Sequence, residues 1–133
     1  MAQRTIGQGV GFERTARITG YCAPVKRFCD AKKAELDYEL IDCIETKEGV
    51  LTWILVILHT GRHHQIRVQM AHAGMPLAGD RKYGAGTNVT IGAGSLALCA
   101  ASLTFFHPVT GKVMKFVTKP EGAEFKGISI PQM

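Results

Sequence analysis

The stretch VLTWILVILHTGRHHQIRVQMAHAG, residues 50–74, decides the fold, because it changes from a strand pattern to a helix pattern within a few residues. Residues 50–58 are almost all β-branched, aromatic or aliphatic, which is typical of a central strand covered on both faces. Thr60 is a suitable N-cap and Gly-Met-Pro at 74–76 is a stop signal, so we predict a helix from Arg62 to Ala73.

The segments on either side of this stretch have the patterns of further strands. Apolar and polar residues alternate from Leu36 to Ile44, as in a strand with one buried face, and Lys47-Glu48-Gly49 is typical of a hairpin turn. Two more strands are predicted at Ser95–Phe106 and Val113–Thr118, joined by a turn at 107–112. This order of elements predicts an α+β fold with a mostly antiparallel mixed sheet and one main helix.

The length of 133 residues fits one domain. Residues 1–20 contain four glycines and little periodicity, so we expect a loop-like or weakly ordered N-terminus. Residues 21–133 are then expected to form the folded unit.

The composition favours a globular, nucleic-acid-binding protein. With 46% hydrophobic and 20% charged residues, the chain can bury enough apolar surface to exclude wholesale disorder. The net charge of +5 attracts polyanions such as nucleic acid. Four cysteines at irregular intervals exclude a disulfide-stapled secreted domain, and no apolar run is long enough for a membrane span. We therefore expect a cytoplasmic protein without a membrane partner.

The densest polar cluster is Arg62-His63-His64-Gln65, followed by Arg67, at the start of the predicted helix. Helix N-termini and nearby arginines attract phosphates, so this cluster is a candidate anion or nucleotide site. The alternative is a solvated, positively charged helix start. A zinc site is not expected, because adjacent histidines on a helix point in different directions and no HExxH motif or cysteine partner accompanies them.

Two segments of the chain resemble the signature of the RluA-type RNA pseudouridine synthases. Residues 60–68, TGRHHQIRV, and 74–84, GMPLAGDRKYG, are similar to its TGR-[TS]-HQ-[IL]-RVH and G-P-I-x-GD-x-x-YG motifs. Residues 32–38 and 96–111 resemble the family's flanking segments in the same order. The chain is thus identified by resemblance as the C-terminal part of such a catalytic domain.

The resemblance implies a reaction on RNA, in rRNA or tRNA, that needs no cofactor. The glycosidic bond of a uridine breaks, the base turns over and it is reattached through C5. By position, Arg67 corresponds to the arginine that pairs with the family's catalytic aspartate. The resemblance further implies substrate binding by five residues, of which the last packs beneath the pocket: Arg62, His63, His64, Gln65 and Ile66.

The chain departs from the family in one important respect, since it contains no HRLD motif, in which the catalytic aspartate stands. Asp80 belongs to the Gly-Asp loop, where we expect it to make turn hydrogen bonds. We therefore expect a partial catalytic domain that is inactive alone and that is completed by an N-terminal half. The alternatives are a non-catalytic RNA-binding module and a self-associating remnant that forms a homodimer. Phe105, Phe106 and Trp53 are candidates for base stacking, but their strand patterns favour core packing.

Overall fold

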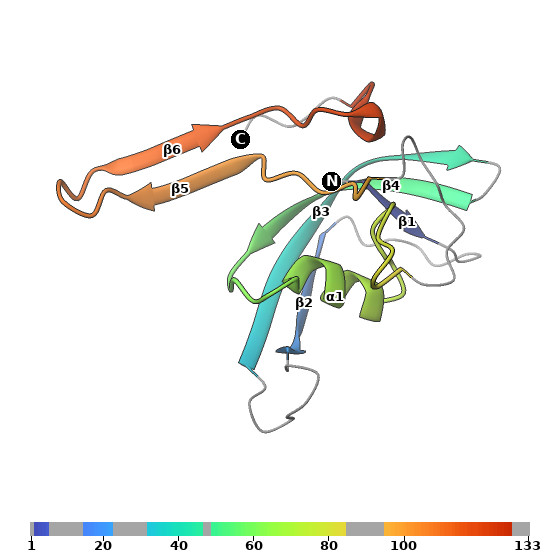
Figure 1. The fold of residues 1–133 in the computed structure, drawn as a ribbon, viewed down its shortest axis with the longest axis horizontal. Coiled ribbons are helices and arrows are strands. Elements are labelled where there is room, and N and C mark those ends of the chain that lie inside the picture. Colours follow the sequence, from blue (N-terminus) through green and yellow to red (C-terminus); the bar gives the residue numbers. More distant parts are fainter. Residues whose placement is uncertain (1, 6–14, 23–31, 47–48, 85–94, 129–133) are drawn as a thin grey trace.

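The computed structural model describes residues 2–5, 15–22, 32–46, 49–84 and 95–128. In this part, a strongly twisted antiparallel sheet carries helix α1 on one face, and a two-stranded hairpin projects away from it (Figure 1). The expected α+β class, with antiparallel pairing and one main helix, is confirmed.

The main sheet has the strand order β1-β4-β3-β2 in the described residues, and every pair is antiparallel. Its strands are β1 (Ala2–Thr5), β2 (Thr15–Cys22), β3 (Lys32–Thr46) and β4 (Gly49–Leu58). The predicted central strand is therefore internal to the sheet. Residues 47 and 48 of the predicted turn lie outside the described residues, and the flanking residues Thr46 and Gly49 pair with each other.

The N-terminal stretch 1–20 differs from the loop-like expectation where it is described. Strand β1 pairs with β4 and strand β2 pairs with β3, so these segments are held by long-range partners. Residues 1–20 as a whole are rich in glycine and weakly patterned, and pairing with a distant strand is a tertiary effect that overrides such a weak local signal.

Strand β3 shows the predicted alternation. Leu36 and Tyr38 are buried, whereas Asp37 and Glu39 lie on the other face. A register shift between Leu40 and Asp42 inserts one extra residue into the strand. The bulge places Asp42 opposite Trp53, on the same face as Asp37 and Glu39.

Helix α1 runs from Gln65 to His72 and is shorter than predicted at its N-terminal end. His64 has φ 51°, a left-handed conformation that cannot belong to the helix, so the helix begins after it. The predicted cap by Thr60 is wrong, because its hydroxyl is used elsewhere. The predicted stop is confirmed, since Gly74 has φ 78° and closes the last turn. No helix among the described residues has the length and apolar character to cross a membrane.

Helix α1 faces the sheet with Met70, which is fully buried against Leu36, Tyr38, Ile54 and Leu77. Ile66 packs at the edge of this cluster, whereas Ala73, just after the helix, is exposed. A second cluster joins Leu51, Trp53, Ala78 and Ala97, which confirms the core position of Trp53.

The projecting hairpin consists of β5 (Ser102–Phe106) and β6 (Val113–Val117). Its turn is confirmed, with Gly111 at φ 68°. The strand predicted from residue 95 is formed only from residue 102 onward. Core packing of Phe105 and Phe106 is wrong, since both rings are exposed and Phe106 has 73% of its surface accessible. The reason is that no other described segment covers the hairpin.

Candidate functional site

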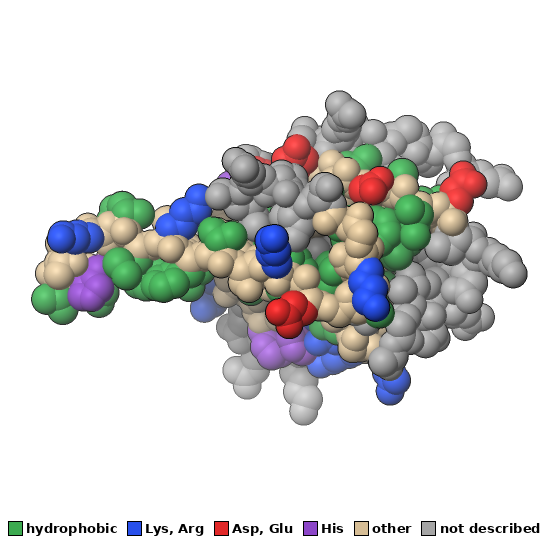
Figure 2. All heavy atoms as spheres, turned by 90° about the horizontal axis from the view of Figure 1, so that it is seen from above, with side chains coloured by type: hydrophobic (Ala, Val, Ile, Leu, Met, Phe, Trp, Pro, Cys, Tyr) green, Lys and Arg blue, Asp and Glu red, His purple; other side chains and the backbone are tan. Residues whose placement is uncertain are grey.

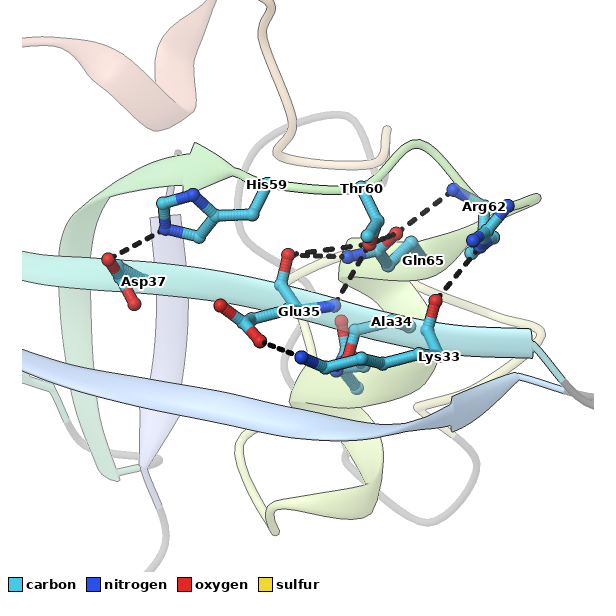
Figure 3. A network of polar contacts seen from close by, with 9 residues as sticks. Lys33, Ala34, Glu35, Asp37, His59, Thr60, Arg62 and Gln65 are labelled. Atoms are coloured by element: carbon cyan, nitrogen blue, oxygen red, sulfur yellow. Dashed lines mark hydrogen bonds and ion pairs between the residues drawn. The ribbon is translucent and has the colours of Figure 1, made fainter.

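The loop before helix α1 is fixed by a network that we call the Gln65 clamp, formed by Glu35, Thr60, Arg62 and Gln65 (Figure 3). The Gln65 Oε1 atom accepts hydrogen bonds from the Thr60 hydroxyl at 2.8 Å and from the Arg62 backbone N–H at 2.9 Å. Its Nε2 atom donates to the Glu35 carbonyl at 3.1 Å. The Glu35 N–H in turn donates to the Thr60 hydroxyl at 2.9 Å. Strand β3 therefore both accepts a hydrogen bond from the loop and donates one to it.

Gln65 is only 3% exposed, and the clamp satisfies its buried amide. The Arg62 carbonyl also accepts from the Gln65 N–H at 3.0 Å, so the two residues bond reciprocally, as in a capping box. The sequence analysis assigned Gln65 to substrate binding and did not predict that its side chain is buried. The [ST]-x-x-[EQ] pattern that normally signals a capping box is absent, because position 62 is an arginine.

The Arg62 side chain is anchored at one point to the end of strand β3. Its Nε atom donates to the Lys33 carbonyl at 3.0 Å (Figure 3). Within the described residues, its two Nη groups have no hydrogen-bond acceptor. The guanidinium is thus oriented, and four N–H donors remain for a carboxylate or a phosphate.

The two histidines lie beside Arg62 in the same loop. Their rings stack at 3.8 Å, and His63 is exposed whereas His64 is half-buried. The His64 Nδ1 atom is 3.1 Å from the Tyr83 hydroxyl. Partial burial, followed by the nearby positive charges of His63, Arg67 and Lys82, lowers the pKa of His64. Its imidazole is therefore neutral at pH 7 and able to act as a hydrogen-bond acceptor or donor.

Arg67 makes a two-point ion pair with Asp80. Its Nε and Nη2 atoms each donate to a carboxylate oxygen at 2.9 Å. The Asp80 side chain has no exposed surface, and its Oδ1 atom also accepts from the Lys82 and Tyr83 backbone N–H groups at 3.0 Å. The predicted turn hydrogen bonds of Asp80 are present. The hydrogen bond from Arg67 lowers the pKa of the Asp80 carboxyl, against the opposing effect of burial.

The arrangement brings together Arg62, His63, His64, Gln65 and Arg67 at one end of helix α1, with Ile66 packed beneath them. Sequence reasoning missed two participants, the backbone of Glu35 and the side chain of Tyr83. The Tyr83 ring lies 5.1 Å below the Arg67 guanidinium and in edge contact with His64. Among the described residues, no group of three histidine, cysteine or acidic side chains is positioned to hold a metal ion.

Several curated proteins are similar to this chain, although no family model matches it. An uncharacterized RNA pseudouridine synthase of Synechocystis sp. is 30% identical over 128 residues, which is 96% of this chain and 37% of that protein. Ribosomal large subunit pseudouridine synthase D of Vibrio parahaemolyticus is 40% identical over 122 residues, covering 84% of this chain and 35% of the relative. Ribosomal large subunit pseudouridine synthase C of Escherichia coli is 47% identical over 78 residues, covering 54% and 24%.

The fold is also similar to that of a solved structure, human RNA Pseudouridylate Synthase Domain Containing 1. The TM-score is 0.67 at 20% sequence identity, and the match covers 90% of this chain and 52% of the human chain. The chain therefore spans about half of a protein with this fold, and about a quarter to a third of the curated relatives.

Proposed function

The chain is a partial-length relative of the RluA-type RNA pseudouridine synthases, and on this premise we propose that it supplies the nucleotide-binding half of a uridine-isomerising site. The nucleophilic aspartate of that site comes from a different segment. The chain alone then binds RNA without converting uridine to pseudouridine.

The observation that carries this proposal is the Gln65 clamp. Three of its four residues lie within the stretch 60–67, and it holds the loop in one conformation, with the Arg62 guanidinium at the end of strand β3. A preorganised cation loses little entropy when it meets an anion, which favours tight binding of a phosphate or an incoming carboxylate.

We assign the pairing with a catalytic aspartate to Arg62, whereas the family resemblance assigns it to Arg67. The reason is donor availability. Arg67 already gives two hydrogen bonds to Asp80, a carboxylate of the chain itself. Arg62 gives one to a backbone carbonyl and has four donors left within the described residues. In this proposal Arg67 is a positioning residue that fixes helix α1 against the loop at 79–84.

The remaining residues of the loop have supporting roles toward RNA. The exposed His63 ring, stacked on His64, presents a flat face on which an unpaired base can stack. Asp80 is unsuitable as the nucleophile, because it is buried and both its oxygens accept hydrogen bonds. The carboxylate that attacks the glycosidic bond therefore has to be supplied from elsewhere.

RNA binding by Arg62 is tested with a single-stranded, uridine-containing RNA whose affinity is measured by fluorescence anisotropy across a series of salt concentrations. Replacing Arg62 by Ala removes one phosphate contact, so the slope of log affinity against log salt falls by about 0.7. Lys112→Ala is the matched control, because it removes the same charge from the hairpin turn. An equal fall of the salt slope in both variants would show that Arg62 acts only through its contribution to the net charge.

The absence of chemistry in the isolated chain is tested by tritium release from RNA labelled at uridine C5. We expect no release, because the reaction needs a carboxylate nucleophile. Release at an ordinary enzymatic rate would contradict the proposal of a partial site.

A non-catalytic RNA-binding module is the second candidate, and the oriented Arg62 guanidinium beside the exposed His63 ring favours it, because both suit RNA binding without a reaction. Both candidates predict RNA binding through Arg62. They differ when the chain is mixed with the part of a relative that lies outside the match. Only a partial catalytic site then releases tritium from the labelled RNA.

A further inference from the structure

A groove with a volume of about 680 Å³ lies between strand β4 and the segment that leads into strand β5. Residues 54–58 line one side and residues 98–104 line the other, with Phe125 and Ile128 also in contact with it. Most of these side chains are apolar. Strand β4 forms the first side, and residues 102–104 of the second side belong to strand β5, so the groove runs along strand β4 and the start of strand β5.

Among the described residues, the β4 side of the groove is a sheet edge without a partner strand. Strand β1 pairs with β4 only at residues 50–53, on the edge opposite to β3. The His59 N–H donates to the Glu35 carbonyl, and hydrogen-bonded pairs alternate along an antiparallel ladder. Ile54, Val56 and Leu58 therefore direct their N–H and C=O groups away from β3, toward the edge that no described strand occupies.

The β5–β6 hairpin has one face that is entirely apolar. The cross-strand pairs Leu103–Phe116 and Phe105–Met114 share this face, and the two phenylalanine rings stack at 6.0 Å. The opposite face is mixed, with the pair Thr104–Lys115 next to the pair Phe106–Val113. Figure 2 shows the hydrophobic side chains exposed along the projecting hairpin. Such a pattern is typical of a strand pair with one buried face, and an isolated hairpin is only marginally stable in water.

The apolar hairpin face is continuous with the groove, because Leu103 belongs to both and is 60% exposed. On the opposite side of the groove, Ile57 is 50% exposed. An unpaired edge with large apolar side chains on both sides is a site for the addition of a strand, in which main-chain hydrogen bonds provide affinity and side chains provide specificity.

We propose that this groove receives an extended strand from the part of a pseudouridine synthase polypeptide that the match to this chain leaves out. The strand pairs with residues 54–58 of β4, and its apolar side chains cover Leu103 and Phe116. The choice of occupant follows from chain length, because the matched human fold contains about as much chain again outside the match. The inference rests on the proposed function, since the same polypeptide would supply the aspartate.

The test mixes the full chain with a polypeptide that comprises the part of Vibrio parahaemolyticus pseudouridine synthase D outside its matched segment. Light scattering measures the mass, and amide hydrogen exchange measures protection residue by residue. We expect a one-to-one complex in which the amides of Ile54, Val56 and Leu58 exchange at least about tenfold more slowly than in the free chain, because each gains a ladder hydrogen bond.

Two matched variants locate the contact. Ile57→Lys places a charge in the groove and is expected to weaken the complex at least about tenfold. Val109→Lys introduces the same charge at the hairpin turn, outside the groove, where Val109 is 87% exposed, and is expected to leave the affinity unchanged. Equal effects of the two variants would overturn the proposal.

The other occupants are distinct outcomes that would also overturn it. A concentration-dependent dimer of the chain alone, with protection at residues 54–58, would assign the groove to a second copy. Protection of these amides by RNA alone would assign it to nucleic acid. A complex with no protection at the groove would place the contact elsewhere, and no complex would remove the inference.

Tritium release separates this inference from the proposed function. A protected groove in a complex that releases no tritium from labelled RNA would support the strand and contradict the catalytic site. Tritium release by a complex with an unprotected groove would support the site and contradict the strand.

Discussion

Removing the Gln65 amide tests the clamp directly. Gln65→Met keeps a side chain of similar size and deletes three hydrogen bonds, two accepted by Oε1 and one donated by Nε2. A typical intramolecular hydrogen bond contributes about 1 kcal/mol, so the three together contribute about 3 kcal/mol. Thr60 and Glu35 are only partly buried, and water can replace part of what is lost. The expected fall in the free energy of unfolding is therefore about 2 kcal/mol.

The measurement is urea denaturation followed by circular dichroism, with the free energy extrapolated to water. His72→Ala is the control on the same helix, because His72 is exposed, and it is expected to change the free energy by less than about 0.5 kcal/mol. Thr60→Val removes the hydroxyl that links Gln65 to Glu35. Since the two residues share one network, the double variant should lose about 1 kcal/mol less than the sum of the single variants.

The reasoning would be refuted if Gln65→Met lowered the free energy of unfolding by less than about 0.5 kcal/mol in a chain that keeps its circular dichroism spectrum. Three hydrogen bonds to a buried amide are expected to contribute more than that. Full additivity of Gln65→Met and Thr60→Val would likewise show that the two side chains do not act together.

Two further predictions concern the loop at 79–84. Because the pKa of Asp80 is lower in the folded protein, its ionised form stabilises the fold above its unfolded pKa of about 3.9, and this contribution is lost as pH falls through the lower folded value. Asp80→Asn should thus destabilise the chain clearly at pH 7 and much less at pH 2, as measured by urea denaturation. The control Glu121→Gln, at an exposed position, should change the free energy of unfolding little at either pH. A loss of stability for Asp80→Asn that does not depend on pH would contradict the ion pair. Gly79→Ala places a Cβ 1.9 Å from the Ser95 carbonyl oxygen, in addition to the strain of φ 75°, so the backbone must shift. Gly74→Ala has similar strain at φ 78° but no atom within 4 Å, and should cost only about 1–2 kcal/mol; thermal unfolding that ranks Gly74→Ala as the more damaging would contradict the close approach of residues 79 and 95.

The local sequence was a good guide wherever the structure follows local rules. Residues 49–58 form a strand because their side chains are β-branched and apolar, and helix α1 ends at Gly74 because glycine adopts a positive φ easily. The motif at 60–67 marked the loop that the clamp holds, and the alternation in β3 marked its buried face.

Tertiary structure decided which groups meet. Sequence spacing does not show that Gln65 reaches the Glu35 carbonyl, 30 residues away, or that Arg67 finds its carboxylate in Asp80, 13 residues away. Both arginines stand in one cationic cluster of the sequence, and only the folded chain shows that Arg67 gives two hydrogen bonds to a buried carboxylate, whereas Arg62 gives one to a backbone carbonyl among the described residues. The exposed Phe105 and Phe106 have the same physical explanation. Their apolar strand pattern favours burial, but the two neighbours point to opposite faces of the hairpin, and burial depends on a covering partner that the strand pattern alone does not identify.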